Sequence, residues 1–376
     1  MKAALVAGEA SGDLLASLLL QGMRPRWPGL QAHGIGGARM QEQGFEPWWP
    51  ADKLAVRGYA EVLRQFREII GIRRALRERL LRERPDIFIG VDAPDFNLGL
   101  EEDLRAAGIP TVHFVCPSIW AWRMKRVEKL KRACDHVLCI FPFEPELLAR
   151  HGVRGSYVGH PLAGVIPMEP DRAGARQSLG LPADAEVVAV LPGSRMSEVE
   201  AMTPRFLRAA QELQRSRGDV HFVLPALPYV RARVEAIARE VGPLRNLSIV
   251  DGQSHAVLAA CDVALVASGT ATLEAALFKR PMVISYHTHW LSYLLMKPRH
   301  LQPWIGLPNI LCAEFVVPEL LQSNAQPQQL ANAVLDWLRS PDRMQAVQER
   351  FRVMHTQLRR DTATLAADAI QEVLAR

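Results

Sequence analysis

The stretch Ala267-Ser268-Gly269-Thr270-Ala271-Thr272-Leu273-Glu274 follows the apolar run 263–266 and leads into helix-forming residues at 275–277. It therefore predicts a strand, a tight turn and the start of a helix. Backbone N–H groups in the first turn of a helix have no partner within it, and the helix dipole adds partial positive charge, so such a turn binds phosphate. Glu274 lies about one helical turn further on, where a carboxylate could accept hydrogen bonds from two sugar hydroxyls. On these residues alone, an ordinary turn capped by Ser268 or Thr270 is an equal alternative.

The same alternation of short apolar runs and helical segments recurs along the whole chain. Runs of this length, bounded by Gly, Pro or Asp, indicate parallel sheets built from strand–helix–strand units. Strands are predicted at 3–7, 87–91, 111–115, 136–140, 187–191, 221–224, 247–250, 263–266 and 282–285. The predicted fold class is therefore α/β, with two Rossmann-like parallel-sheet domains facing a cleft.

The length of 376 residues favours two α/β domains over one. The proline-rich, aperiodic segment 165–171 is predicted as the linker. The predicted domains are thus 1–165 and 166–350. Residues 351–376 are predicted as a C-terminal helix that packs on the N-terminal domain or on a partner chain, which leaves a homodimer as an alternative.

The composition is typical of a globular protein, with 49% hydrophobic and 23% charged residues. A net charge of +5 leaves nucleic acid, an anionic membrane surface or a phosphorylated substrate as candidate partners. The basic run 123–132 has no accompanying nucleic-acid motif, so nucleic acid is not predicted as a partner. The five cysteines form no C-x-x-C pair, which predicts reduced thiols in a cytosolic compartment. No stretch reaches the ~18 apolar residues of a membrane span, so any membrane contact is predicted to be peripheral.

Two carboxylates follow the predicted strand 87–91, within Asp92-Ala93-Pro94-Asp95-Phe96-Asn97. An acid at the carboxyl end of a strand can act as a general base when a substrate hydroxyl comes within hydrogen-bond reach. The alternative is that Asp92 caps a turn and Asp95 caps a helix. Whether Asp95 assists Asp92 is left open by the sequence.

The turn Leu191-Pro192-Gly193-Ser194-Arg195 follows the first predicted strand of the second half. A glycine–serine turn that ends in arginine offers backbone donors and a guanidinium, which binds phosphate oxygens bidentately. Neutralisation of Arg195 by Glu198 and Glu200 is the alternative. Together with the turn at 268–274, this segment predicts one diphosphate between two turns of the same domain. Because no Asp, Glu or His cluster is typical of a magnesium site, we expect no metal and no other cofactor.

Residues 62–81 combine apolar residues at helical spacing with six arginines. A basic amphipathic helix can lie in a membrane interface, with arginine stems covering apolar surface. An ordinary core-facing helix with a solvated face is an equal alternative. The predicted membrane patch consists of Val62, Leu63, Phe66, Ile69 and Ile70.

Taken together, these motifs resemble the lipid-A-disaccharide synthase family. The segments that carry the resemblance run in order over nearly the whole chain, at 6–13, 91–97, 117–123, 159–161, 191–195, 267–274 and 307–309. Asp-Ala-Pro-Asp-Phe-Asn and Ser-Ile-Trp-Ala-Trp-Arg, at 92–97 and 118–123, are the most specific. The Pro-Gly-Ser-Arg and Ser-Gly-Thr turns are shared with other nucleotide-sugar transferases. Residues 287–304 match only loosely, so no acyl-chain contacts are predicted there.

The resemblance implies an inverting GT-B hexosyltransferase of Gram-negative lipid A and lipopolysaccharide biosynthesis. It would join UDP-2,3-diacylglucosamine to 2,3-diacylglucosamine 1-phosphate (lipid X), giving the β(1→6)-linked disaccharide 1-phosphate and UDP. The resemblance also implies roles for single residues: Asp92 as general base, Asn309 as a second catalytic residue, and Arg195 and Ser11 as substrate contacts. The family works at the inner face of the cytoplasmic membrane, through an apolar patch on the helix matching 62–70. By this resemblance, domain 1–165 would hold the acceptor and face the membrane, and domain 166–350 would bind the UDP-sugar.

Two other functions fit part of the pattern. Another GT-B enzyme that uses a UDP-sugar, an epimerase or a cell-wall precursor transferase, would share the phosphate turn. It would lack the segment around Asp92 and the basic amphipathic helix. A non-catalytic peripheral lipid-binding protein would bind anionic vesicles but release no UDP.

Overall fold

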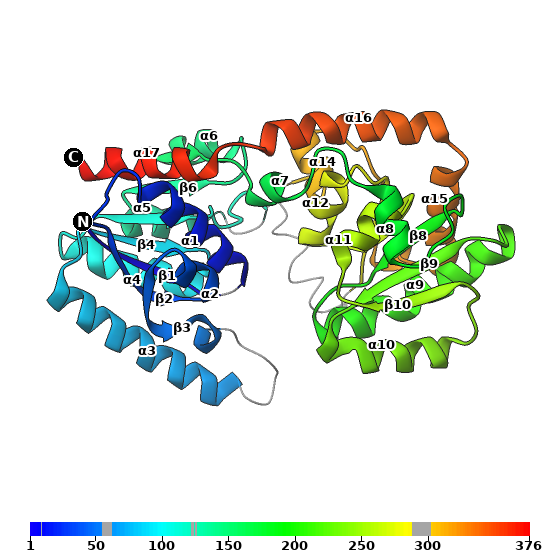
Figure 1. Ribbon diagram of the computed structural model, residues 1–376, viewed down its shortest axis with the longest axis horizontal. Coiled ribbons are helices and arrows are strands. Elements are labelled where there is room, and N and C mark those ends of the chain that lie inside the picture. Colours follow the sequence, from blue (N-terminus) through cyan, green and yellow to red (C-terminus); the bar gives the residue numbers. More distant parts are fainter. Residues whose placement is uncertain (9, 55–61, 122–123, 125, 288–301) are drawn as a thin grey trace. The chain divides into compact units, whose positions relative to one another are not determined.

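The computed structural model describes residues 1–376 except 9, 55–61, 122–123, 125 and 288–301, and it does not place the side chains of 10, 52 and 62–66. The chain forms two compact units, Met1–Pro161 with Leu358–Arg376, and Leu162–Gln357 (Figure 1). The chain therefore crosses between the units twice. The first crossing lies four residues before the predicted boundary at 165.

The first unit is built on a parallel sheet in the order β3-β2-β1-β4-β5-β6-β7. Its strands are β1 (Lys2–Ala7), β2 (Gln31–Gly36), β3 (Phe45–Pro50), β4 (Ile87–Val91), β5 (Thr111–Phe114), β6 (His136–Cys139) and β7 (Gly155–Tyr157). All residues of β4 and β5 are buried. Continuous apolar strands of this kind are expected where helices cover both faces of a parallel sheet.

Helices cover both faces of the first sheet (Figure 1). Its helices are α1 (Ala10–Met23), α2 (Ala38–Glu42), α3 (Val62–Glu83), α4 (Pro94–Ala106), α5 (Arg126–Ala133), α6 (Glu144–Ala149) and α17 (Thr362–Leu374), with a 3-10 turn η1 at Ala51–Leu54. Along one face α1 packs against α2 and α17, and along another α4 packs against α3 and α5. The basic helix α3 buries Ile72, Leu76 and Leu80 in the core under α4.

The second unit has a parallel sheet in the order β10-β9-β8-β11-β12-β13. Its strands are β8 (Val187–Leu191), β9 (His221–Ala226), β10 (Leu247–Asp251), β11 (Val263–Ala267), β12 (Met282–Tyr286) and β13 (Glu319–Leu321). Its helices are α7 (Pro161–Val165), α8 (Arg172–Ser178), α9 (Met196–Ser216), α10 (Pro228–Val241), α11 (Ser254–Ala260), α12 (Thr270–Leu277), α14 (Leu307–Cys312), α15 (Pro327–Leu338) and α16 (Pro341–Leu358), with a 3-10 turn η3 at Gln322–Asn324. Helices α10 and α15 pack on α9, while α11 packs on α8 and α12. The prediction of two Rossmann-like parallel-sheet domains is confirmed.

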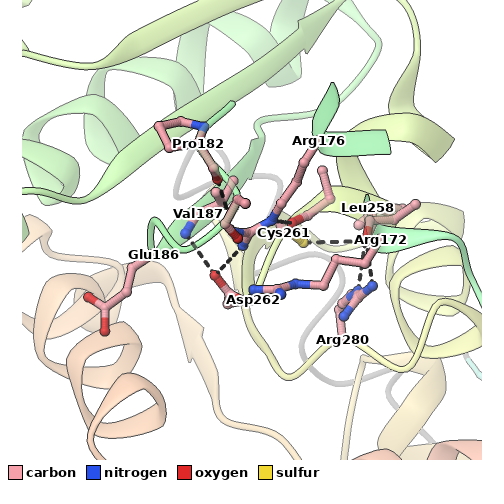
Figure 2. Close-up of polar contacts among 12 residues, drawn as sticks. Arg172, Arg176, Pro182, Glu186, Val187, Leu258, Cys261, Asp262 and Arg280 are labelled. Atoms are coloured by element: carbon pink, nitrogen blue, oxygen red, sulfur yellow. Dashed lines mark hydrogen bonds and ion pairs between the residues drawn. The ribbon is translucent and has the colours of Figure 1, made fainter. Parts of the chain in front are cut away.

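The amino ends of β8 and β11 are fastened by a buried ion pair (Figure 2). The Arg176 guanidinium is 3% exposed and lies 2.9 Å from Asp262 Oδ2, which also accepts a hydrogen bond from Val187 N at 2.8 Å. The remaining donors of Arg176 bond to the carbonyls of Ala260, Pro182 and Ala183. Since a buried charge is tolerated only when it is paired and hydrogen-bonded, this cluster fixes the edge of the sheet opposite the turns considered below.

The C-terminal segment differs from the single helix predicted at 351–376. It forms α16 and α17, and Asp361 caps α17 by accepting a hydrogen bond from Thr364 N at 3.1 Å. α17, red in Figure 1, packs along the blue α1 of the first unit, while α16 lies almost wholly in the second unit. The helix predicted as one element is thus divided between the two units.

Candidate active site

Asp92 lies at the carboxyl end of β4 in a turn that is held on both sides. Asp92 and Ala93 adopt left-handed backbone conformations, with φ of 52° and 43°, which are costly for residues other than glycine. Asp92 N donates to Phe114 O at 2.8 Å. The Asp92 carbonyl accepts a hydrogen bond of 2.9 Å from the amide of Asn97, which is fully buried. These bonds hold the strained turn and leave the Asp92 side chain partly exposed.

A cavity of about 160 Å³ opens beside this turn, and it is lined by Asp92, Pro94, Val115, Cys116, Pro117, Ser118 and Arg126. Arg126, the first residue of α5, forms an ion pair with Asp95, the second residue of α4. The Asp95 carboxylate is engaged by this guanidinium. The geometry therefore assigns Asp95 to Arg126, and among the described residues that line the cavity the one carboxylate is that of Asp92.

The cavity wall is stiffened by a buried carboxyl group that sequence reasoning missed. Glu144 accepts hydrogen bonds from Trp120 Nε1 at 3.1 Å and from the backbone N–H groups of Ile140 and Phe141. Burial raises the pKa of Glu144 to about 8. Burial also raises the pKa of the Cys116 thiol, which keeps it protonated and excludes it as a nucleophile at neutral pH. Trp120, in the motif at 118–123, is thus held in place just after the cavity-lining residues 116–118.

Ser11 lies on the same edge of the sheet as Asp92. Strands β1 and β4 are neighbours, with Ala7 opposite Val91, and the helix that follows β1 begins at Ala10. A Cβ on Gly12 would lie 3.7 Å from Val91 O, so this helix start and the end of β4 are in close approach. Ser11 is exposed there. The structure therefore places Ser11 and Asp92 at the same edge of the first sheet.

In the second unit, the turn after β8 carries Arg195, whose side chain is 79% exposed. Glu198 Oε2 accepts hydrogen bonds from Ser194 N and Arg195 N, at 3.1 and 3.2 Å, while its Oε1 lies 2.9 Å from Arg195 Nη1. The sequence predicted free backbone donors here, and that prediction is wrong, because Glu198 occupies them. A diphosphate at this turn would have to compete with Glu198 for the guanidinium.

The turn after β11 is open. Gly269 precedes α12 with φ of 156°, and a Cβ added there would meet no atom within 4 Å. The N-cap position is Gly269 itself, with no side-chain cap hydrogen bond. Neither Ser268 nor Thr270 therefore caps the helix, which removes the alternative of an ordinary capped turn. Gly269 and Thr270 are exposed and Ala271 is half-buried, so the first turn of α12 presents backbone to solvent.

Glu274 lies one turn into α12 with 20% of its side chain exposed. Its Oε2 is 3.5 Å from His255 Nε2, on α11. The His255 ring in turn contacts Phe278, with ring centroids 5.2 Å apart. Sequence reasoning missed His255, because nothing in the sequence shows that α11 and α12 pack together. This neighbour fixes the direction of the Glu274 carboxylate.

The two turns of the second unit lie on neighbouring strands. β8 and β11 pair in parallel with Leu191 opposite Val266, so the residues after both strands reach the same edge of the sheet. The turn that carries Arg195 and the segment 268–274 therefore follow neighbouring strands at one edge of the sheet. A phosphate group at this edge would meet an open helix start and an exposed guanidinium.

Asn309, predicted as catalytic, is fully buried. Its amide nitrogen donates to Val317 O at 2.9 Å and to Glu319 Oε1 at 2.8 Å. Its amide oxygen accepts from Val316 N at 2.9 Å and Val317 N at 3.0 Å. These four bonds engage both polar atoms of the Asn309 side chain. Asn309 therefore links α14 to the start of β13 and the residues before it.

A family model described as lipid-A-disaccharide synthetase matches residues 3–373. The chain belongs to this family. The lipid-A-disaccharide synthase of Albidiferax ferrireducens is 60% identical over 100% of this chain and 97% of its own length, and that of Verminephrobacter eiseniae is 57% identical over 100% and 98%. The predicted family and the predicted glycosyltransferase activity are confirmed.

Solved structures show the same fold at low identity. The UDP-GlcNAc 2-epimerase of Neisseria meningitidis superposes with a TM-score of 0.66 at 12% identity, covering 100% of both chains. The MurG protein of Acinetobacter baumannii superposes with a TM-score of 0.58 at 13% identity, covering 99% of both. These similarities show the fold alone. Because the full-length relatives are synthases, an epimerase or a non-catalytic lipid-binding protein is not favoured.

The membrane patch falls partly outside the described residues. The side chains of Val62, Leu63 and Phe66 are not described; Ile69 packs against the core, and Ile70 is 51% exposed. Among the residues that the structure places, no helix is long and apolar enough to cross a bilayer. Over the same residues, no group of three or more His, Cys, Asp or Glu side chains is arranged to hold a metal ion.

Replacement of Asn309 separates a structural role from a catalytic one. Asn309→Ala removes four hydrogen bonds and leaves buried groups unpaired, so it should lower the free energy of unfolding by about 2–4 kcal/mol. Urea unfolding followed by circular dichroism measures the change. Asn332→Ala, at an exposed position on α15, is the matched control and should change it by less than about 0.5 kcal/mol. Loss of turnover in an Asn309→Ala protein of unchanged stability would instead make Asn309 a substrate contact.

Proposed function

We propose that this chain joins UDP-2,3-diacylglucosamine to 2,3-diacylglucosamine 1-phosphate by an inverting displacement, with Asp92 as general base. The observation that carries the proposal is the position of Asp92: its backbone is fixed by Phe114 and Asn97, and its carboxylate lines a cavity. A base must hold a fixed place relative to the hydroxyl that it deprotonates. The family membership supplies the substrate class.

In the proposed reaction, Asp92 takes the proton from the acceptor 6-hydroxyl as that oxygen attacks the anomeric carbon of the donor. The bond from this carbon to the diphosphate oxygen breaks, and the electron pair leaves with UDP. The sugar passes through an oxocarbenium-like transition state, as in glycoside hydrolysis. Inversion follows because the entering and leaving oxygens are on opposite faces of the ring.

The donor half of the proposal rests on the second unit. The open start of α12 and the Arg195 guanidinium would stabilise the charge that develops on the leaving diphosphate, and Glu274 would accept hydrogen bonds from the ribose. Asn309 would contribute indirectly, as a positioning residue whose hydrogen bonds hold the segment 307–319 in place. A leaving group stabilised in this way needs no metal ion, so we propose metal-independent transfer.

The proposed base and the proposed ribose contact predict different defects. Asp92→Ala removes the base, which typically contributes ~10²–10⁴-fold, so turnover should fall by about that factor while UDP affinity is kept. Glu274→Ala removes charged hydrogen bonds and should weaken UDP binding roughly tenfold or more. Steady-state product formation and calorimetric titration with UDP measure the two effects.

Asp103→Ala is the matched control for the first variant, because Asp103 is an exposed carboxylate on α4 that pairs with Arg77. It should leave both turnover and UDP affinity unchanged. Near wild-type turnover in Asp92→Ala would contradict the role of Asp92. Unchanged UDP affinity in Glu274→Ala would remove Glu274 from the donor site.

Both proposed substrates are lipids, and we propose that the protein meets them at the inner face of the cytoplasmic membrane through the start of α3. Ile70 is an exposed apolar residue on a helix rich in arginine, which suits an anionic lipid surface. The mixed character of α3 also serves the fold, since Ile72, Leu76 and Leu80 face the core. A homodimer stays a prediction.

Vesicle co-sedimentation tests the membrane proposal. Ile70→Asp should weaken binding to vesicles that contain anionic lipid by roughly 5- to 10-fold, because it replaces an inserting apolar side chain with a charge. Val353→Asp is the matched control, as Val353 is 50% exposed on a helix of the second unit. Equal binding by the two variants, or equal binding of the unaltered protein to neutral and anionic vesicles, would contradict the proposal.

A further inference from the structure

We propose that Arg126 binds the phosphate of the acceptor and so sets the enzyme's preference for a phosphorylated sugar. The inference rests on the proposed function, because it places the acceptor in the cavity beside Asp92. Among the described residues that line this cavity, Arg126 is the one cation. Its side chain is 21% exposed, so the guanidinium is partly shielded from water. Charge-assisted hydrogen bonds are stronger in such a shielded place than in water.

The chemistry of the acceptor requires an anion site close to the base. In a glucosamine 1-phosphate, the carbon that bears the 6-hydroxyl side arm and the carbon that bears the phosphate both flank the ring oxygen. The phosphate is therefore separated from the 6-hydroxyl by less than the span of one sugar ring. A cavity of about 160 Å³ that contains both Asp92 and Arg126 fits the edge of such a ring. A guanidinium binds two phosphate oxygens at once.

The present partner of Arg126 can be displaced. Asp95 pairs with Arg126, but its side chain is 84% exposed, and exposed ion pairs contribute little to stability. A phosphate group carries more charge than a carboxylate and offers three oxygens, so it competes well for the guanidinium. Until the acceptor binds, Asp95 keeps the Arg126 side chain directed across the gap between α5 and α4. This gives the second carboxylate of the Asp92 segment a role other than catalysis.

A purely structural role for the pair is the alternative, and α5 itself provides the comparison. Arg132, near the end of the same helix, pairs with Glu102 of α4 at 2.7 Å. This pair links the same two helices, yet neither residue lines the cavity. Arg132 is therefore a matched control: it shares the helix, the residue type and the kind of partner, and it differs in its distance from the proposed site.

The test compares two acceptors, lipid X and the same diacylglucosamine without its 1-phosphate. Arg126→Ala should raise KM for lipid X roughly 10- to 100-fold, which corresponds to the loss of a charged hydrogen-bonded pair. It should leave KM for the dephosphorylated acceptor and the Kd for UDP unchanged. Arg126→Lys should recover part of the loss, because it keeps the charge but not the fork. Arg132→Ala should change none of these constants.

Several results would overturn the inference. An equal rise of KM for both acceptors in Arg126→Ala would show a structural role, as would a loss of activity matched by a lower unfolding temperature. A weaker affinity for UDP would place Arg126 with the donor.

Asp95→Asn keeps the size of the partner and removes its charge. It should not raise KM for lipid X, and a rise equal to that of Arg126→Ala would show that the ion pair itself is required. Failure of the proposed function is distinct, since the unaltered protein would then form no disaccharide from either acceptor.

Discussion

Parallel strand pairing determines which loops of this molecule can share a site. In the first unit β1 and β4 are paired with Ala7 opposite Val91, and in the second unit β8 and β11 are paired with Leu191 opposite Val266. All connections that follow these strands emerge at the carboxyl edge of their sheet, where ligands of open α/β sheets bind. For this reason Ser11 and Asp92 lie at one sheet edge, and so do the turn that carries Arg195 and the start of α12. The buried pair of Arg176 and Asp262 lies at the opposite, amino edge of the second sheet.

Charged groups at the carboxyl edge of each sheet already have partners. Arg195 is paired with Glu198, Arg126 with Asp95, and the Glu274 carboxylate faces His255. The contacts with Asp95 and His255, whose side chains are 84% and 44% exposed, orient the charged groups without binding them tightly, because water screens exposed charges. A phosphorylated substrate can therefore exchange places with a side chain at small cost. Asp92 differs, since it is held through its backbone and its carboxylate stays available.

Local sequence was enough to predict nine of the strands, because strands buried on both faces are continuous apolar runs. β2 and β3 were missed because they are not continuous apolar runs. Gln31–Gly36 contains two glycines, and Phe45–Pro50 contains two prolines. β7 and β13 were missed because they have three residues each. Their pairing depends on neighbours far away in the chain. The same limit applies to the site: the motifs located Asp92, Arg195 and the turn at 268–274, whereas His255 and Glu144 become visible only when helices and loops are packed. For Asn309 the motif was recognised in the sequence, but its complete burial could be known only from the structure.

The reaction proposed for this protein transfers a diacylated sugar from UDP to the 6-hydroxyl of a second, phosphorylated sugar, without a metal ion. It can be tested by incubating the purified protein with UDP-2,3-diacylglucosamine and lipid X and analysing the lipid products by mass spectrometry, with and without a chelator. We expect a disaccharide 1-phosphate and UDP in equal amounts, unchanged by the chelator. Release of UDP without disaccharide, or loss of the product on chelation, would contradict it.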